Sequence, residues 1–468
     1  MSETDAMPGV GRAEISGIGA LGEWAPGVCR GGTAVPVLIG RFYDRAGRLT
    51  ATDRCQRVAS WDAFEQSFMS GPFAVFDMAS AELRRAAPQA RSAASVRVYF
   101  ENGGGPCYVS SLPSAPADLK AALAGLPARI RACREISLLV WCEVEAALDE
   151  AVLGALGRLL SSGAQNAGYF LLTDARREGK RIVAPATSEP AQTAAYYPGL
   201  WPSRAPTPGV WVAGLDARRW GASILSLEAF EQARAHWPAQ TDGPEAIAER
   251  DAWARLQGQL GAYLSPGTAP ADTDVHGWGP PVRASVAMAG VLARVDDERG
   301  VWKAPAYVVV RGAAELVDVG TGEMIRVDDA MIDTLEAERV NALRGFAGLG
   351  VLAWGARTLA GQAQPQWREV SVRRLCNAVQ RDVGELLRAA RGRAGQRPAW
   401  ARVRETLTHY LGQLWRQGAL QGSRPEQAYF VALQPDDASD RMRVQIGLAV
   451  GRPSEFVVLE LTQALAAG

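Results

Sequence analysis

Apolar strand patterns alternate with helical patterns over the first 200 residues, and this alternation constrains the fold more than any other feature. The strand patterns lie at 33–42 (TAVPVLIGRF), 107–112 (CYVSSL), 135–144 (EISLLVWCEV) and 168–174 (GYFLLTD). Helical patterns lie between the last three strands, at 115–132 and 145–163. Because strands alternate with helices of these lengths, we expect an α/β layer with a largely parallel sheet.

Two helical stretches precede the second of these strands. Residues 60–69 (SWDAFEQSFM) form the first, with Ser60 as candidate N-cap, because a serine oxygen can accept from the free N–H groups of the first turn. The second follows it and ends near Phe100.

The character of the chain changes between Pro198 and Pro281. Pro/Gly-rich stretches at 196–211 and 264–281 bracket one helical pattern at 245–264, and six of the fourteen tryptophans lie in this region. We interpret residues 201–281 as an insertion or small subdomain. Tryptophans packed in a small core are favoured there over an exposed interface.

Two amphipathic helices and two strands are predicted in the last third. The helix at 367–391 has one apolar face, formed by Val372, Leu375, Cys376, Val379, Val383, Leu386 and Leu387. A second helix at 398–420 aligns Val403, Leu407, Tyr410, Leu411, Leu414 and Trp415, with Gly418 as its C′ residue. Residues 441–450 alternate apolar and polar side chains, as in a half-buried strand, and a final strand lies at about 455–463.

Charge and cysteine content exclude several classes of protein. Fifty basic side chains balance fifty acidic ones, so net charge is no argument for nucleic acid or anionic lipid as a partner. The polar N-terminus has no signal-peptide pattern, and no apolar run is long enough to span a bilayer. Six scattered cysteines without a Cys-x-x-Cys pair favour buried thiols over zinc or disulfides. We therefore expect a protein made and folded in the cytoplasm.

Three consecutive glycines raise the question of a phosphate-binding loop. Such a loop runs from a strand through glycines into a helix, whose first N–H groups face the anion. Here the order is reversed, since a helix tail precedes Gly103 and a strand follows Gly105. We predict a structural turn with a left-handed C-cap, and no nucleotide or other cofactor. Its residues are Asn102, Gly103, Gly104 and Gly105.

The sequence contains no convincing set of nucleophile, base and orienting group. His409 lies in an amphipathic helical pattern, and His276 lies in a Pro/Gly-rich stretch near Asp272 and Asp274. A solvated loop is favoured there over a metal site. Since hydrolase and zinc-protease motifs are also absent, we predict no catalytic residue and no metal site.

Several segments resemble the contractile tail sheath proteins of phage tails, R-type pyocins and extracellular contractile injection systems. The strongest are GVLARVDDERGVWKAPA (290–306), GVLAWGARTLA (350–360) and WREVSVRRLCNAVQRDV (367–383). Segments at 33–40, 98–109, 194–201 and 452–463 fit the same family in the same order. Two parts depart from it: the opening PGVGRAEIS (8–16) is reduced, and the stretch at about 203–279 is longer than expected.

The resemblance implies a tail sheath fold, α/β plus α+β. It consists of a subtilisin-like α/β domain without catalysis, a C-terminal α+β domain and extended terminal arms. We expect an N-terminal arm at 1–32, the α/β domain at 33–200, the insertion at 201–281, the C-terminal sheath domain at 282–454 and a terminal strand at 455–468.

The resemblance also implies a function. Many copies would polymerise helically around an inner tube and contract to drive that tube through a target membrane. The implied partners are other copies, possible sheath paralogues, the inner tube protein, the baseplate and the tail terminator or cap, with no nucleic acid and no direct membrane insertion. Assembly would take place in the bacterial cytoplasm, before release by lysis. A baseplate or tail-terminator component is the second hypothesis, and an α/β hydrolase-like enzyme is a remote third.

The last strand is the candidate link between subunits. It has little downstream chain with which to pair, so it can add to a neighbour's sheet through main-chain hydrogen bonds. An ordinary intramolecular edge strand is the alternative. Removing residues 455–468 is expected to leave a folded monomer that cannot polymerise. The residues of the proposed exchange are Phe456, Val458, Leu459 and Leu461.

The arginine-rich helix at 367–391 is the candidate contact with the inner tube. A weak, charged contact suits a tube that must be held and then released, because it is specific but easily broken. A solvated face or a sheath–sheath face is the alternative. The residues of this contact are Arg373, Arg374, Arg381 and Arg388.

Overall fold

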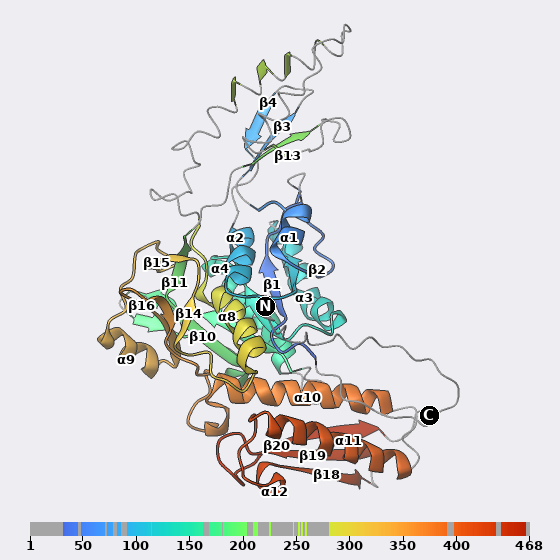
Figure 1. Cartoon of the computed structure of the whole chain (residues 1–468). Helices are drawn as coiled ribbons and strands as arrows, with labels where there is room; N and C mark the ends of the chain where they lie inside the picture. Colours follow the sequence, from blue (N-terminus) through green and yellow to red (C-terminus); the bar gives the residue numbers. More distant parts are fainter. Residues whose placement is uncertain are drawn as a thin grey trace, which may run out of the picture.

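A computed structural model provides the fold of the chain (Figure 1). It describes residues 31–44, 48–70, 73–77, 82–85, 91–113, 115–161, 168–179, 181–203, 209–213, 224–225, 280–390, 397–436 and 441–464, with a few further positions between 247 and 259. The N-terminal arm expected at 1–32 and the helix expected at 245–264 therefore lie largely outside the described residues.

The structure has a larger unit and a smaller C-terminal unit. A nine-stranded sheet forms the centre of the larger unit. Its strand order is β14-β17-β16-β10-β7-β6-β1-β5-β2. The six strands from β16 to β5 run parallel, whereas β2, β17 and β14 run antiparallel to their neighbours. The prediction of a largely parallel sheet is confirmed. The strands are β1 (Pro36–Gly40), β2 (Gln56–Val58), β5 (Cys107–Ser111), β6 (Leu138–Trp141), β7 (Phe170–Asp174), β10 (Thr193–Tyr197), β14 (Val308–Val310), β16 (Val340–Phe346) and β17 (Gly350–Ala353).

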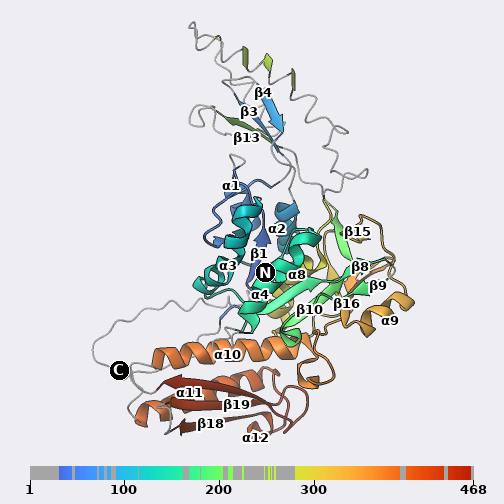
Figure 2. The same ribbon diagram turned by 180° about the vertical axis from the view of Figure 1, so that it is seen from behind.

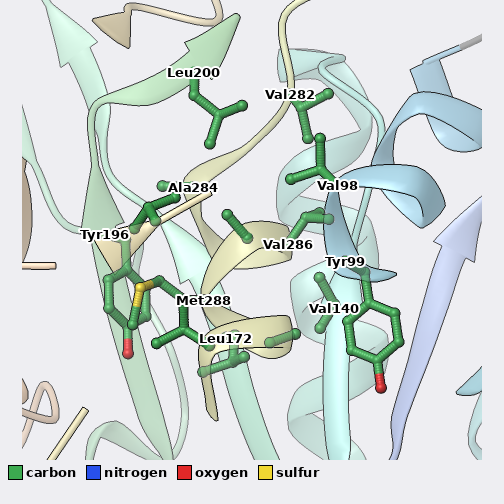
Figure 3. Packing of buried hydrophobic residues seen from close by; sticks show 14 of the residues in the cluster. Val98, Tyr99, Val140, Leu172, Tyr196, Leu200, Val282, Ala284, Val286 and Met288 are labelled. Atoms are coloured by element: carbon green, nitrogen blue, oxygen red, sulfur yellow. The ribbon is translucent and has the colours of Figure 1, made fainter. Parts of the chain in front are cut away.

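Helices cover both faces of this sheet. Helices α3 (Pro116–Ala132) and α4 (Ala146–Leu160) pack on the face formed by Val37 and Ile39 of β1. Helices α2 (Arg91–Glu101) and α8 (Ala284–Arg299) pack on the opposite face, where Leu38 points. Figure 3 shows Val286 of α8 in this second core, beside the strands. Because successive side chains of a strand point to opposite faces, central strands covered on both sides are apolar throughout.

The remaining elements of the larger unit are short and surround the sheet. Helix α1 begins after Ser60, whose Oγ accepts from the Ala63 N–H (3.2 Å), so the predicted N-cap is confirmed. The elements are α1 (Trp61–Ser67), α9 (Asp329–Ala337), β8 (Arg176–Glu178), β9 (Arg181–Val183), β11 (Gly199–Pro202), β15 (Ala313–Val317), η2 (Pro190–Gln192) and η3 (Pro365–Trp367).

The C-terminal unit packs two long helices on one face of a three-stranded antiparallel sheet. Its elements are α10 (Val370–Ala390), α11 (Arg397–Arg416), α12 (Pro425–Ala428), β18 (Tyr429–Asp436), β19 (Arg441–Leu448) and β20 (Val457–Ala464). The predicted apolar faces of α10 and α11 form its core with Val444 and Ile446, although Val372 is only half-buried. Gly418 has φ +78° at the end of α11, as predicted for its C′ residue. In Figures 1 and 2, α10 lies between the larger unit and the rest of the C-terminal unit.

The boundary between the two units differs from the one expected at residue 282. Strands β14, β16 and β17 complete the nine-stranded sheet, and helix α8 completes its core, which extends to Val370. Helix α8 is buried on nearly every side, from Ala284 to Val295, as a helix at the centre of a domain is. The C-terminal unit therefore begins close to α10, and residues 282–360 belong with residues 33–200.

A separate four-stranded sheet is formed by two distant segments. Its order is β13-β12-β3-β4, and its strands are β3 (Phe73–Asp77), β4 (Glu82–Arg85), β12 (Gly209–Ala213) and β13 (Ile224–Leu225). Figures 1 and 2 show these strands at the far end of the molecule from the C-terminal unit. The insertion is thus built partly from residues 73–85, where only a helix ending near Phe100 was expected.

The glycine triplet ends helix α2. Gly103 has φ +92°, its N–H donates to Phe100 O (2.9 Å), and the Gly104 N–H donates to Tyr99 O (3.0 Å), which is the paired bonding of a Schellman cap. The buried Asn102 side chain joins this cap to the turn after β14, donating to Arg311 O (3.0 Å) and accepting from Arg311 N–H (2.9 Å). The arrangement matches the predicted structural turn.

Substitution of Gly104 by alanine tests how closely this turn is packed. A Cβ at Gly104 would overlap the Tyr99 ring, whereas a Cβ at Gly105 would meet no atom within 4 Å. We expect Gly104→Ala to lower the free energy of unfolding by about 1–3 kcal/mol. Urea denaturation measures this change, with Gly105→Ala as the matched control. Equal stabilities of the two variants would contradict the packing argument.

Candidate assembly surfaces and the domain junction

The last strand, β20, pairs with β19 of the same chain. The two strands are antiparallel and in register over eight residue pairs, from Val457 opposite Leu448 to Ala464 opposite Arg441. In the single chain the strand therefore takes the alternative arrangement, an intramolecular strand paired with an upstream neighbour. Its other edge pairs with no strand among the described residues, so β20 is an edge strand.

The four residues predicted for strand exchange lie on two sides of the C-terminal sheet. Leu459 and Leu461 point into the core, and Leu459 is 6% exposed. Val458 lies on the outer face, where it is 50% exposed. The ring of Phe456 contacts that of Phe430 edge to face, with centroids 5.2 Å apart.

Because Leu459 and Leu461 belong to the core, the effect expected of removing residues 455–468 needs correction. Without β20, the apolar side chains of β19 and α10 that pack against it would face water. The sheet therefore needs a third strand with the same apolar alternation, whether from its own chain or from another copy. A monomer truncated before β20 is expected to be destabilised rather than normally folded.

Two of the four arginines predicted to contact a tube are buried inside the molecule. Arg373 is 8% exposed, lies over the Trp367 ring (4.1 Å to its centroid) and donates to Asn377 Oδ1 (2.9 Å). Burial lowers its pKa. Arg374 is 3% exposed. Neither guanidinium is available on the surface of the chain, because α10 is covered on two sides.

The other two arginines lie nearer the surface. Arg388 is exposed and pairs with Glu385 (2.7 Å). Arg381 is half-buried, and its Nε and Nη1 atoms are buried without a hydrogen-bond partner among the described residues. Burial lowers the pKa of Arg381, and the neighbouring Asp382 opposes that shift. Of the four arginines, these two remain candidates for an external contact.

Arg374 joins the two units through a buried ion pair. Its Nη2 and Nη1 atoms lie 2.6 and 2.9 Å from the carboxylate oxygens of Asp296, at the end of α8. The two side chains are 3% and 7% exposed. A buried charge is costly unless it is paired and hydrogen-bonded, so this contact fixes α10 against the core helix of the larger unit.

The start of the described chain is held at the same junction. The Thr33 carbonyl accepts from Arg374 Nη2 (3.0 Å), and the Gly31 N–H donates to Asp382 Oδ1 (3.1 Å). The other oxygen of Asp382 accepts from the hydroxyl of Tyr410 on α11 (2.8 Å). The root of the N-terminal arm is thus bonded to α10 by the residues that hold the two units together.

Amide side chains form a second polar contact between the units. Asn377 Nδ2 donates to Gln192 Oε1 (2.7 Å) and to the Tyr169 carbonyl (3.3 Å). Both amides are almost fully buried. Because buried polar groups are satisfied only in one arrangement, these bonds fix the rotation of α10 relative to the sheet.

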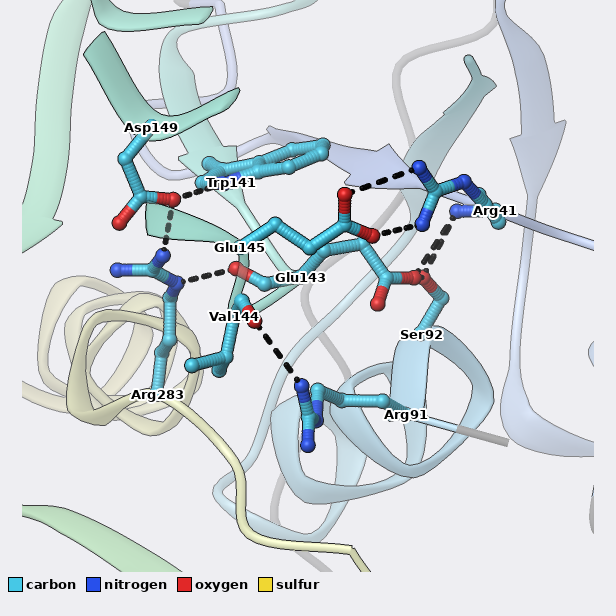
Figure 4. A network of polar contacts seen from close by, with 9 residues as sticks. All are labelled: Arg41, Arg91, Ser92, Trp141, Glu143, Val144, Glu145, Asp149 and Arg283. Carbon is cyan, nitrogen blue, oxygen red and sulfur yellow. Dashed lines mark hydrogen bonds and ion pairs between the residues drawn. The ribbon is translucent and has the colours of Figure 1, made fainter. Parts of the chain in front are cut away.

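The edge of the sheet where α/β proteins usually bind ligands is filled by a polar network (Figure 4). Arg41 follows β1 and Glu143 follows β6, so both lie at carboxyl ends of parallel strands. The Arg41 N–H donates to Ser92 Oγ (2.9 Å), and the Ser92 hydroxyl is bonded to the Glu143 carboxylate. Arg283 donates to the Glu143 carbonyl (2.7 Å) and to Asp149 Oδ1 (2.6 Å).

This network has the properties of an internal scaffold. Ser92 and Glu143 are fully buried and Arg283 is 5% exposed, so the groups face one another and not an open cleft. Nearby, Asp174 accepts from the Ser285 N–H (3.1 Å), and burial raises the pKa of Asp174. Sequence reasoning missed these residues, although the position of Arg41 and Glu143 directly after apolar strands was a usable signal.

The histidines and metal ligands can be located only in part. His409 is exposed on α11, with its Nε2 atom 2.8 Å from Gln413 Nε2, and His236 and His276 lie outside the described residues. In the described part of the chain, no three Asp, Glu, His or Cys side chains gather as they would around a metal ion. Within those same ranges, no helix has both the length and the hydrophobicity needed to cross a bilayer.

Replacing Arg374 by methionine tests the domain junction. Asp296 would be left buried and unpaired, so we expect the free energy of unfolding to fall by about 3–5 kcal/mol. The matched control is Arg388→Met, which removes an exposed pair on the same helix and should cost less than about 1 kcal/mol. Chemical denaturation measures both changes, and similar losses in the two variants would contradict a structural role for the buried pair.

Comparison with known proteins identifies similarity to sheath proteins. Residues 362–463 match the family described as phage tail sheath C-terminal domain, and this match begins where the structure places the C-terminal unit. Among curated proteins, none matches the chain significantly.

Solved structures extend the similarity to nearly the whole chain. A chain in the contracted helical sheath of the anti-feeding prophage (AFP) is 27% identical with a TM-score of 0.62, over 96% of this chain and 99% of that one. A chain in the contracted sheath complex of PVC, an extracellular contractile injection system, is 25% identical with a TM-score of 0.58, over 99% of both chains. A chain in the AFP baseplate is 27% identical with a TM-score of 0.61, over 98% of this chain and 99% of that one. The chain thus matches the phage tail sheath C-terminal domain over residues 362–463 and is similar to contractile sheath chains over nearly its whole length.

Proposed function

We propose that this chain is the structural subunit of a contractile sheath, which polymerises helically around an inner tube and contracts to drive the tube through a target membrane. The observation that carries this proposal is the similarity to AFP and PVC sheath chains over nearly the full length of each. The filled polar edge of the sheet supports a structural role without catalysis or a cofactor. The partners would be other copies, the tube protein, the baseplate and a terminator or cap, with assembly in the bacterial cytoplasm.

Strand exchange through β20 is the proposed link between subunits. The edge position of β20 and the loop of residues 449–456 before it would let the strand leave its own sheet and pair with β19 of a neighbour. The neighbour's core would then receive Leu459 and Leu461 in the same register. Such a link can survive contraction, because the connecting loop absorbs a rigid-body movement between two packings of the subunits.

Electron microscopy of the purified chain tests the sheath function. We expect tubes or stacked rings, formed alone or in the presence of the tube protein. Uniform small particles that never polymerise under either condition would contradict the proposal.

A baseplate component is the second candidate, because a chain of the AFP baseplate is as similar to this one as the sheath chain is. It predicts closed rings that do not elongate when tube protein is added. The same images therefore separate the two candidates.

Cysteine cross-linking tests strand exchange. Gln445 and Glu460 are opposite each other on β19 and β20, and both lie on the outer face of the C-terminal sheet. When Gln445→Cys and Glu460→Cys subunits are mixed and assembled, we expect disulfide-linked dimers. A mixture of Gln445→Cys with Arg452→Cys, an exposed position outside the strands, is the control. Polymers without these dimers, together with an intrachain link in the double variant, would show that β20 stays in its own sheet.

The tube contact is proposed for Arg388, with Arg381 beside it. Because exposed charged contacts contribute less than about 1 kcal/mol, Arg388→Met should weaken binding to the tube by up to about fivefold and reduce its salt dependence. Co-sedimentation with the tube protein measures this, with exposed Arg404→Met on α11 as control. Equal binding by the two variants would remove Arg388 from the contact.

A further inference from the structure

Two of the cysteines differ from the others in their access to water. Of the five described, Cys107, Cys142 and Cys376 are fully buried, whereas Cys55 and Cys133 are half-buried and free. Cys29 lies outside the described residues. An oxidant can reach a half-buried thiol more readily than a fully buried one, so among the five described cysteines these two are the more open to modification.

The fold brings Cys55 and Cys133 to the same place. Cys55 directly precedes β2, and Cys133 directly follows α3. Two residues further along each segment, Arg57 Nε donates to Glu135 Oε2 (3.2 Å), which holds the segments side by side. The Tyr108 hydroxyl, opposite Arg57 in the sheet, donates to the same carboxylate oxygen (3.0 Å).

Both side chains point to the same core. Residues two apart in a strand share a face, so Cys55 lies on the side of β2 from which Arg57 reaches Glu135. Cys55 and Cys133 pack against one apolar cluster, which includes Leu126 and Ile130 of α3. The two thiols are close enough to affect each other's pKa.

We propose that Cys55 and Cys133 are an oxidisable thiol pair, a modification site that closes to a disulfide between the edge strand β2 and the end of α3. The oxidant would be a low-molecular-weight disulfide such as oxidised glutathione. One cysteine thiolate attacks it, forms a mixed disulfide and releases one glutathione. The second thiolate then displaces the second glutathione, so the two protons and two electrons lost by the pair end in two glutathione thiols.

The reaction is expected to be slow at neutral pH and faster in alkali. Burial raises the pKa of Cys55 to about 11 and also raises that of Cys133, so little thiolate is present near pH 7. Below these values the rate should rise about tenfold per pH unit, because the thiolate is the reacting form. The charged and titratable groups around the pair are Asp53 before β2, Arg57 in β2, Arg129 in α3, Glu135 after α3, Tyr108 in β5 and Tyr169 just before β7.

The disulfide would anchor a short edge strand of the large sheet. Strand β2 has three residues and, among the described strands, pairs with β5 alone, so it has a single row of main-chain hydrogen bonds there. A covalent link across residues 55–133 restricts the unfolded chain and holds this edge in place. Oxidation should therefore raise the thermal midpoint of the protein.

Treatment of the full chain with oxidised glutathione at pH 8.5 tests the proposal. Peptide mapping without reductant should detect a peptide pair joined through Cys55 and Cys133, and the thermal midpoint should rise. Cys55→Ser and Cys133→Ser should each lose the cross-link and that rise, leaving a glutathione adduct on the remaining cysteine. Cys376→Ser, at a buried position, should keep both. Separate glutathione adducts on Cys55 and Cys133 of the unaltered chain, or no reaction at either unless the chain is denatured, would overturn the proposal.

Discussion

The joining of the two units depends on one guanidinium that has been removed from water. Arg374 can be buried because Asp296 and the Thr33 carbonyl accept hydrogen bonds from its Nη1 and Nη2 atoms. These two partners come from different parts of the chain. Three segments, the arm root, α8 and α10, therefore meet where a single charge must be satisfied. Displacing any one of these segments would take a hydrogen-bond partner away from the buried charge. The junction therefore has one favourable arrangement.

Buried charged groups are also paired with one another at the carboxyl ends of the parallel strands. An open α/β sheet normally leaves a crevice at the carboxyl ends of its strands. Here Arg41, Glu143 and Arg283 close that crevice with contacts among themselves and with the neighbouring helices. Polar residues are present at this position, as in other α/β proteins, but here they connect strands to helices. A rigid unit suits a subunit that must move as a body within an assembly.

Local patterns predicted much of the fold. The apolar run of β1, the serine before α1 and the glycines after α2 and α11 each act through nearby backbone geometry, and each was found from the sequence. Long-range pairing was not predictable in the same way. Nothing local indicates that residues 73–77 pair in parallel with residues 209–213, or that α8 completes the first core and does not begin a second one.

Local patterns also failed to reveal the long-range contacts of the predicted site residues. A helical projection assigns Arg373 and Arg374 to a solvent face because it allows one buried side, whereas α10 has two. The alternation of Leu459 and Leu461 correctly indicated a half-buried strand, but alternation does not say which chain provides the sheet.

The intrachain pairing of β20 has a consequence for the energetics of assembly. If neighbours exchange this strand as proposed, each subunit gives away the eight residue pairs that it receives, and the same leucines fill the same core. The exchanged sheet is then close to neutral in free energy. It would act as a tether that carries load between subunits, while the drive to polymerise and the difference between extended and contracted lattices arise at other surfaces. In a free subunit, β20 also occupies the edge of β19 that a neighbour's strand would otherwise pair with. The strand would therefore delay exchange until subunits assemble.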